Sequence, residues 1–262
     1  MPEATPDDDH ALAGALAARA GEALVALRAE LVARGADRWT LMDAGDLAAQ
    51  RLLAEALAVE RPGDAVLSEE AVDDRKARLG APRVWVVDPL DGTQEFGDPE
   101  RREWAVHVAL VEAGAVTAAA VALPDWGQLL MTRPAPPPPP PLDGRRPRVV
   151  TSRWRPPGPA VALAGALGAD IVGLGGAGAK IMAVVLGDAD VYAPGGLNEW
   201  DAAAPAGVAL AAGLHVSRFD GSPLTFNQPD PWVAGLLVCR AELAHECLAT
   251  LRHFPTGRRD PY

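Results

Sequence analysis

The sequence predicts an α/β protein in which helices pack on two β-sheets. Three observations lead to this prediction. Two long helical patterns open the chain, a block of short β-rich runs follows them, and α and β segments then alternate behind a run of six prolines. With 262 residues, of which 49% are hydrophobic, the chain is long enough to bury a substantial core. We therefore expect a soluble, layered α/β body.

The first half of the chain combines two helices with a sheet-forming block. Apolar residues recur at helical spacing over residues 9–34, and the pattern returns over residues 41–58. Short runs rich in β-forming residues follow, separated by Gly, Pro and Asp. The expected strands are residues 65–67, 83–87, 105–111, 116–123 and 128–131.

The six consecutive prolines at residues 136–141 divide the chain. Such a run cannot join a helix or a sheet ladder and favours extended polyproline II backbone. We expect it to form a solvated, extended loop that contributes little packing. We expect an N-terminal α+β half (1–135), a proline-rich loop (136–147) and a C-terminal α/β half (148–262). The expected strands of the second half are 148–151, 170–172, 190–192 and 235–239, and its expected helices are 159–167, 179–186, 201–212 and 241–251.

Composition narrows the possible partners and location. A formal charge of −11 repels polyanions, so binding of polymeric nucleic acid is disfavoured. No apolar run approaches the roughly 18 residues that span a bilayer, and residues 1–10 are acidic where a signal peptide is basic. We therefore expect no membrane partner and a cytoplasmic location. Cys239 and Cys247 lack the paired short spacing of a zinc site and are expected to be buried, reduced thiols.

The most informative segment is 84–93, where a strand of buried character runs into Asp88 and Asp91. Adjacent carboxylates resist ionisation unless a cation compensates them, and hard oxygen ligands suit Mg²⁺. Pro89 fixes one φ angle and Gly92 permits a sharp turn, so both carboxylates can point at one place beyond the strand end. An ordinary turn is the alternative, because Asp-Pro and Asp-Gly are common turn dipeptides.

Two further acidic positions strengthen the metal-site interpretation. Glu69 and Glu70 follow the strand expected at 65–67, and Asp201 begins a helix whose N-terminus favours an anion. Each is weak by itself, since acidic residues commonly follow strands and cap helices.

Together these segments resemble the signature of the inositol monophosphatase superfamily. The signature segments are Ser-Glu-Glu at 68–70, Trp-Val-Val-Asp-Pro-Leu-Asp-Gly-Thr at 85–93 and Trp-Asp-Ala-Ala at 200–203, with an early acidic helix at 46–50 and a late turn at 220–224. The stretch 200–228 is similar to the bacterial CysQ-type bisphosphate nucleotidases. The resemblance implies a sugar-phosphatase fold of alternating layers, an αβαβα sandwich, and a Mg²⁺-dependent phosphomonoesterase with two or three ions and sensitivity to Li⁺.

The resemblance also implies roles for individual residues. The metal ligands would be Glu69, Asp88, Asp91 and Asp201 through their side chains and Leu90 through its carbonyl. Asp46 and Thr93 would form a hydrogen-bonded pair that helps to deprotonate the attacking water, with Glu69 beside them in the catalytic set. Phosphate and substrate contacts would come from Leu90, Asp91, Gly92, Thr93 and Asp201. The family pattern selects Glu69 over the adjacent Glu70.

The expected substrate is a small phosphate ester, with 3′-phosphoadenosine 5′-phosphate favoured. A glutamate that contacts inositol in other members is replaced here by Pro194. Ser152 and Arg153 lie where related nucleotidases place a substrate loop, and Lys180 and Arg218 are further candidates for phosphate contacts. Each of these four is also compatible with a structural or solvated role. His107, in a β-rich stretch, and His245, in the expected terminal helix, are expected to be structural or exposed.

Other functions remain open at this point. The same core suits inositol monophosphate or fructose 1,6-bisphosphate, and a non-catalytic metal-binding protein that offers the proline run to a partner is a further possibility. Residues 173–178 match the dinucleotide pattern G-x-G-x-x-G between a strand and a helix, yet the acidic residue expected at the end of the next strand is missing. A homodimer is also left open.

Overall fold

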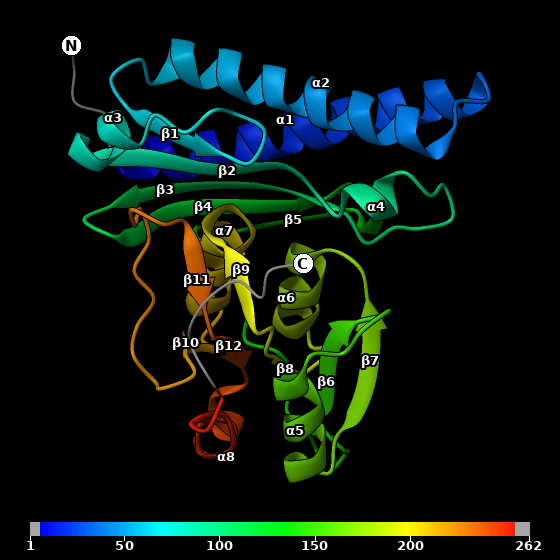
Figure 1. The fold of residues 1–262 in the computed structure, drawn as a ribbon, viewed down its shortest axis with the longest axis vertical. Helices are drawn as coiled ribbons and strands as arrows, with labels where there is room; N and C mark the ends of the chain where they lie inside the picture. Colours follow the sequence, from blue (N-terminus) through cyan, green and yellow to red (C-terminus); the bar gives the residue numbers. More distant parts are fainter. Residues whose placement is uncertain (1–5, 255–262) are drawn as a thin grey trace.

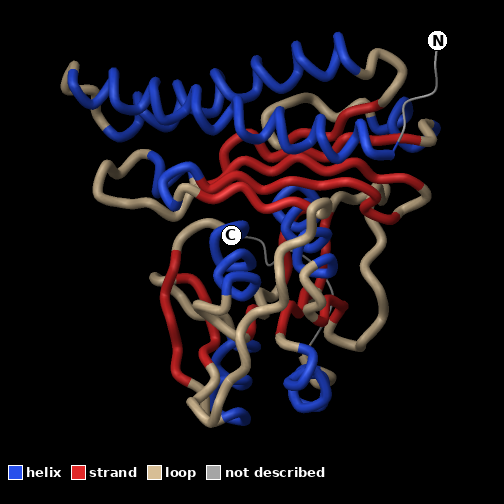
Figure 2. Tube along the Cα trace, turned by 180° about the vertical axis from the view of Figure 1, so that it is seen from behind, coloured by secondary structure: helices blue, strands red, loops and turns tan. Residues whose placement is uncertain are grey.

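The computed structural model describes residues 6–254, which form five layers in the order helix, sheet, helix, sheet, helix (Figure 1). Seen from behind, the first sheet separates a long helical pair from the remaining layers (Figure 2). The fold class predicted from the sequence, a layered αβαβα sandwich, is confirmed. The helices and strands alternate because each sheet has two apolar faces that must both be covered.

The first two layers come from the N-terminal half. Helices α1 (Pro6–Ala33) and α2 (Arg38–Glu60) cover one face of a five-stranded sheet of order β1-β2-β3-β4-β5. The strands of this first sheet are β1 (Ala65–Ser68), β2 (Arg83–Asp91), β3 (Ala105–Glu112), β4 (Ala115–Leu123) and β5 (Gln128–Met131). Two short helices, α3 (Arg75–Gly80) and α4 (Thr93–Phe96), flank β2.

The remaining three layers come mainly from the C-terminal half. Helices α6 (Ala177–Leu186) and α7 (Glu199–Ala211) form the middle layer, and α5 (Gly158–Leu167) and α8 (Ala244–Leu251) cover the far face of the second sheet. That sheet has the order β10-β12-β8-β6-β7. Its strands are β6 (Arg148–Ser152), β7 (Asp170–Leu174), β8 (Val191–Tyr192), β10 (His215–Arg218) and β12 (Leu236–Cys239). A separate ribbon pairs β9 (Gly196–Asn198) with β11 (Trp232–Ala234).

Residue alternation along β2 decides which side chains meet the middle layer. Trp85 and Val87 pack against α1 and α2, whereas Val84 and Val86 face α6 and α7. This period of two is the ordinary geometry of a strand with both faces buried. The face that carries Val84 and Val86 is the one on which the acidic site is built.

Several element boundaries differ from the sequence expectation. Strand β2 runs to Asp91 instead of ending at residue 87, and α7 begins at Glu199, two residues early. Strands β9, β10 and β11 were missed, because each is only three or four residues long and carries little periodicity. Cys239 and Cys247 are buried and unpaired, as predicted.

Helix α1 is long and apolar enough over residues 9–33 to pass a test for a membrane span, which the sequence analysis did not anticipate. The apolar face of this helix is nevertheless covered by other parts of the protein. Ala13, Leu16, Ala20 and Leu24 are buried in the cluster formed with α2 and the first sheet. One face of the helix is therefore packed against α2 and the first sheet, and 39% of the apolar segment is buried.

The proline run packs along one of its sides. Pro136, Pro139 and Leu142 are half-buried while the prolines between them are exposed, a spacing of three that matches the three residues per turn of polyproline II. Together with β5 and the C-terminal end of α6, Pro134 and residues 136–140 line a cavity of about 280 Å³. The run is therefore not the fully solvated loop that the sequence analysis expected.

This packing generates a prediction. Replacing Pro136 and Pro139 by serine should lower Tm by roughly 2–4 °C, because about 1 kcal/mol of apolar burial is lost. The matched control replaces Pro137 and Pro138, so that both variants lose the same chain stiffness. We expect kcat to stay within about twofold in both, since the run contacts the end of α6 opposite the acidic site, roughly 15 Å away along a ten-residue helix. Equal Tm values for the two variants would show that the three-residue packing contributes nothing.

Candidate active site

An irregularity in β2 brings two aspartates to one face of the sheet. Residues three apart on a regular strand point to opposite faces. The pairing of β2 with β3 shifts register between Asp88 and Asp91, and this bulge turns Leu90 into the cluster under α1 and α2. Asp88 and Asp91 consequently both face the middle layer. Bulges of this kind re-aim side chains next to functional sites.

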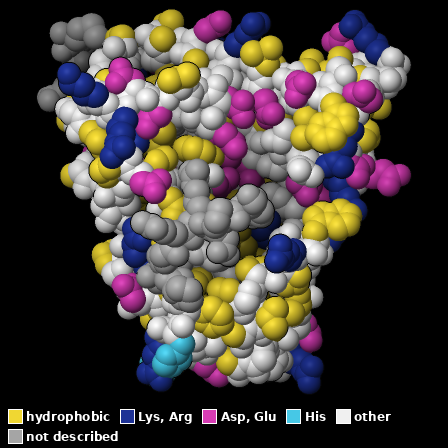
Figure 3. Space-filling model, in the orientation of Figure 1, with side chains coloured by type: hydrophobic (Ala, Val, Ile, Leu, Met, Phe, Trp, Pro, Cys, Tyr) yellow, Lys and Arg dark blue, Asp and Glu magenta, His cyan; other side chains and the backbone are white. Residues whose placement is uncertain are grey.

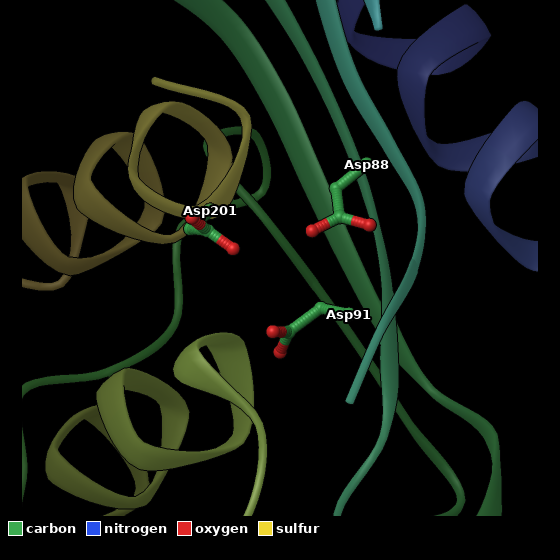
Figure 4. Close-up of side chains that lie close together, drawn as sticks. All are labelled: Asp88, Asp91 and Asp201. Atoms are coloured by element: carbon green, nitrogen blue, oxygen red, sulfur yellow. The ribbon is translucent and has the colours of Figure 1, made fainter. Parts of the chain in front are cut away.

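The third member of the cluster comes from the opposite layer. Asp201 is the third residue of α7, and its Oδ2 accepts a hydrogen bond of 2.9 Å from the N–H of Asn198, as in a capping box. Oxygens of Asp88, Asp91 and Asp201 lie within 4.8 Å of one another. Figure 4 shows the three carboxylates pointing into one space between β2 and α7. On the surface, acidic side chains gather where the first sheet meets the layers below it (Figure 3).

Burial and mutual repulsion make this cluster hard to ionise. Asp88 is fully buried, and its pKa lies well above the usual range because of desolvation, followed by the charges of Glu69, Asp91 and Asp201. Desolvation and then the charge of Asp91 raise the pKa of Asp201 to about 7. Asp88 Oδ1 accepts a hydrogen bond from the N–H of Leu90, but Oδ2 has no partner among residues 6–254. A buried carboxylate oxygen without a donor is a position that a cation would satisfy.

Asp91 is held by the N-terminus of α6. Its Oδ1 accepts from the N–H of Ala177 at 2.8 Å, and its Oδ2 accepts from the N–H of Gly178 at 2.7 Å. The G-x-G-x-x-G pattern at 173–178 therefore leads into a helix whose N-terminus holds Asp91. The helix N-terminus that would bind a dinucleotide phosphate is occupied by a carboxylate of the chain itself. A Cβ at Gly176 would approach Asp91 Oδ2 to 2.9 Å, so the glycine permits this close contact.

The expected pair of Asp46 and Thr93 is present. Thr93 Oγ1 lies 3.3 Å from Asp46 Oδ1 and 3.0 Å from the carbonyl oxygen of Leu90, and its single proton serves one of them at a time. Desolvation raises the pKa of Asp46 to about 6, with the charge of Glu70 adding to it. Gly92 precedes Thr93 with φ of 82°, a left-handed conformation suited to glycine.

Glu69 lies beside the three-aspartate cluster and outside its 4.8 Å limit. Its side chain reaches solvent, yet partial burial and then the charges of Asp201 and Glu70 raise its pKa to about 7. Glu69 also contributes to the raised pKa of Asp88, whereas Glu70 acts on Asp46 and Glu69. Of the two glutamates, Glu69 is therefore the one whose charge acts on Asp88.

The four substrate candidates are placed differently. Lys180 is buried on α6, its pKa is lowered by desolvation, and it interacts with Asp91, Glu95 and Asp201. Arg153 follows β6 and forms an ion pair with Glu103. Ser152 ends β6, opposite Leu174 of β7 and near the start of α6. Arg218 lies on β10, the edge of the second sheet, and donates to the carbonyl oxygen of Ala234 at 3.3 Å.

Sequence reasoning missed two residues, one beside the cluster and one that pairs with Arg153. His107 is fully buried, with its ring nitrogens 3.8 Å from Asp88 Oδ2 and 3.7 Å from Asp91 Oδ2. The sequence analysis took it for a structural or exposed histidine. Strand alternation offered a signal, because His107 is directly opposite Asp88 on β3. Glu103, the partner of Arg153, carried no recognisable sequence signal.

Comparison with known proteins agrees with this geometry. The model of the inositol monophosphatase family matches residues 7–134 and 158–255. A protein from Mycobacterium tuberculosis (strain CDC 1551 / Oshkosh) called 3′-phosphoadenosine 5′-phosphate phosphatase is 50% identical over 235 residues, covering 86% of both chains. The 3′(2′),5′-bisphosphate nucleotidase CysQ of Escherichia coli (strain K12) is 31% identical over 194 residues, covering 70% of this chain and 78% of that one.

Solved structures show the same fold. SuhB from Mycobacterium tuberculosis superposes with a TM-score of 0.73 at 23% identity, over 97% of this chain and 99% of that one. CysQ from Bacteroides thetaiotaomicron, a bacterial member of the inositol monophosphatase family, gives a TM-score of 0.73 at 24% identity, over 89% and 97% of the two chains. The resemblance inferred from the sequence motifs is thereby confirmed, and the chain belongs to the inositol monophosphatase family.

Proposed function

We propose that this protein is a Mg²⁺-dependent phosphomonoesterase that removes the 3′-phosphate of 3′-phosphoadenosine 5′-phosphate, giving AMP and phosphate. The observation that carries the proposal is the cluster of Asp88, Asp91 and Asp201, three buried or half-buried carboxylates within 4.8 Å of one another. Relatives at about 50% identity bear the name of this activity, which supports the choice of substrate.

The donor set fits a hard divalent cation. Carboxylate oxygens, together with the carbonyl of Leu90, are ligands that Mg²⁺ prefers. The side chains of Glu69, Asp88, Asp91 and Asp201 would hold two or three ions. When bound, Mg²⁺ supplies electrostatic stabilisation for the negative charge that develops on the phosphoryl and leaving oxygens.

Thr93 and Asp46 would take up the proton that the attacking water loses. Thr93 Oγ1 would accept a hydrogen bond from the water while donating its own proton to Asp46, whose Oδ1 lies 3.3 Å away. An Asp46 pKa near 6 suits a group that takes up a proton close to neutral pH. The turn at Gly92 and Thr93 would present backbone N–H groups to the phosphate oxygens, as preorganised donors do in other sites.

The substrate's second phosphate would be held on the other side of the cluster. Arg153 and Lys180 lie close enough to each other to interact, and Lys180 also interacts with Asp91. The phosphate that is not cleaved would bind to these cationic side chains. A monophosphate has no second phosphate and would lack this interaction. Ser152 stands beside them at the end of β6, whereas Arg218 contacts Ala234 instead. Cytoplasmic location, a homodimer and inhibition by Li⁺ stay predictions.

The first test separates activity from stability within the acidic cluster. Asp88→Asn and Asp91→Asn should each lower kcat by at least about 100-fold, comparable to deleting one preorganised electrostatic group. Their effects on Tm without metal should differ. Asp88→Asn keeps the contact to Leu90 and removes a buried group that is costly to ionise, so Tm should hold or rise. Asp91→Asn turns an amide N–H₂ toward an N–H of α6, at a cost of about 1–3 kcal/mol.

Kinetics with Mg²⁺ and melting curves in EDTA, both on the same preparations, check these outcomes. Activity of either variant within a few-fold of wild type, with a native circular dichroism spectrum, would remove the metal-ligand assignment.

The second test uses pH. The pKa values of Glu69 and Asp201 rise to about 7 on folding, from an unfolded value near 4. Groups with raised folded pKa values stabilise the fold fully at low pH, and this stabilisation is lost as pH rises through about 7. Bound Mg²⁺ should then stabilise the fold instead, because it compensates the charge of the ionised carboxylates. The increase in Tm on adding Mg²⁺ to EDTA-treated protein should therefore grow between pH 5.5 and pH 8. A Tm increase that is constant or shrinks over this range would contradict the prediction.

The third test concerns substrate choice. We expect kcat/KM for 3′-phosphoadenosine 5′-phosphate to exceed that for inositol 1-phosphate at least tenfold. Arg153→Ala should reduce this preference by about 10- to 100-fold, the equivalent of about 1.5 to 3 kcal/mol for a charge-assisted bond. Arg218→Ala, measured in parallel, should change it much less, because Arg218 has no described contact with the cluster. Equal kcat/KM values for the two substrates, or a preference for inositol 1-phosphate or fructose 1,6-bisphosphate, would overturn the nucleotidase assignment and leave the phosphatase chemistry standing.

A further inference from the structure

His107 occupies the space between the elements that carry the three aspartates. It lies on β3 directly opposite Asp88, on the sheet face that meets α6 and α7. Its side chain is fully buried, with Nδ1 3.8 Å from Asp88 Oδ2 and Nε2 3.7 Å from Asp91 Oδ2. Neither distance is that of a hydrogen bond, so the ring stands against both carboxylates without bonding to them.

The orientation of the ring is fixed from the opposite layer. Nδ1 lies 3.1 Å from the carbonyl oxygen of Trp200, which can only accept, so Nδ1 carries the proton. Trp200 immediately precedes Asp201 in the first turn of α7. The hydrogen bond therefore ties β3 to the turn that presents Asp201.

The third neighbour is the N-terminus of α6. A Cβ at Gly178 would collide with His107 Nε2, so the absence of a side chain at residue 178 is what admits the ring. The N–H of Gly178 is also one of the two that hold Asp91. One imidazole thus touches β2, α6 and α7, the three elements that carry or hold the three aspartates.

We infer that His107 is a positioning residue that sets the spacing of Asp88, Asp91 and the Asp201 turn, and thereby the affinity of the site for divalent cations. This inference rests on the proposed function, because it assigns a role within the same metal site. Loss of an outer group that orients metal ligands typically weakens metal binding 10- to 100-fold. A histidine that merely filled the core would be replaceable by an apolar side chain of similar size.

The experiment compares His107→Leu with His107→Asn in the full-length chain. Leucine keeps most of the volume and removes the donor, whereas asparagine retains an N–H₂ group able to reach the carbonyl oxygen of Trp200. Mn²⁺ binding to EDTA-treated, substrate-free protein is measured by calorimetry or electron paramagnetic resonance. We expect the leucine variant to bind about 10- to 100-fold more weakly, and the asparagine variant to stay within about threefold to fivefold of wild type.

The matched control is Val108→Ala on the same strand. Val108 points to the other face, into the cluster with α1 and α2, so its truncation lowers Tm without touching the site. Its Mn²⁺ affinity should equal that of wild type. Kinetics adds a second readout. In the leucine variant the Mg²⁺ concentration for half-maximal activity should rise at least tenfold, while kcat at saturating Mg²⁺ returns to within about fivefold of wild type.

Three outcomes would overturn the inference. These are wild-type Mn²⁺ affinity in the leucine variant, an equal loss of affinity in Val108→Ala, and an equal loss in the asparagine and leucine variants. If the leucine variant does not fold, His107→Ala removes the same hydrogen bond and takes its place. Failure of the wild-type protein itself to bind Mn²⁺ would instead count against the proposed function, so the two failures are distinguishable.

Discussion

One unfavourable interaction constrains the whole structure: three carboxylates of like charge lie close together and are largely shielded from water. Asp88 and Asp91 from the first sheet and Asp201 from the middle layer converge within 4.8 Å. Repulsion and desolvation both oppose this arrangement, as the raised pKa values of Asp88 and Asp201 express. Such a cluster persists only where the rest of the structure holds the carboxylates in place and a cation compensates their charge.

The supporting structure holds each aspartate by a different local device. The bulge in β2 aims Asp88 and Asp91 at the same face, and two N–H groups of α6 bind Asp91. The capping position of α7 fixes Asp201. The layers behind these devices are closely packed, because α7 brings a run of buried alanines against the first sheet. At Gly207 an added Cβ would come within 2.7 Å of Val116. Small side chains let the helix approach the strands closely and leave little freedom for the cluster to relax.

The two sides of the site have opposite character. Toward α2 lie Asp46, Glu69 and Glu70, whose charges act on one another and on the cluster. Toward β6 and α6 lie Arg153 and Lys180, each facing an acidic neighbour. An anionic substrate would therefore meet bound metal in the centre and protein cations on one side only. This asymmetry would orient a molecule with two phosphates more strongly than one with a single phosphate, which supports the proposed substrate.

How far the sequence determined the protein can be seen at particular residues. Local patterns were sufficient for the layered fold class, for both long helices and for the aspartates of the segment 84–93, because periodicity and strongly polar residues after apolar runs are readable within a few positions. The pairing of Asp46 with Thr93 came from the family resemblance, and the structure places the two oxygens 3.3 Å apart. These features involve residues whose chemistry stands out against their surroundings.

Only the tertiary structure decided what lies across the layers. The glycine pattern at 173–178 could bind a dinucleotide as far as its own sequence shows, yet the fold delivers Asp91 to that helix N-terminus from 86 residues away. His107 looked like an ordinary strand histidine until β2 placed Asp88 opposite it and α7 placed Trp200 at its ring nitrogen. The proline run looked solvated until β5 and α6 were seen beside it. Sequence patterns record the preferences of neighbouring residues, whereas these contacts depend on which distant segments the packed core brings together.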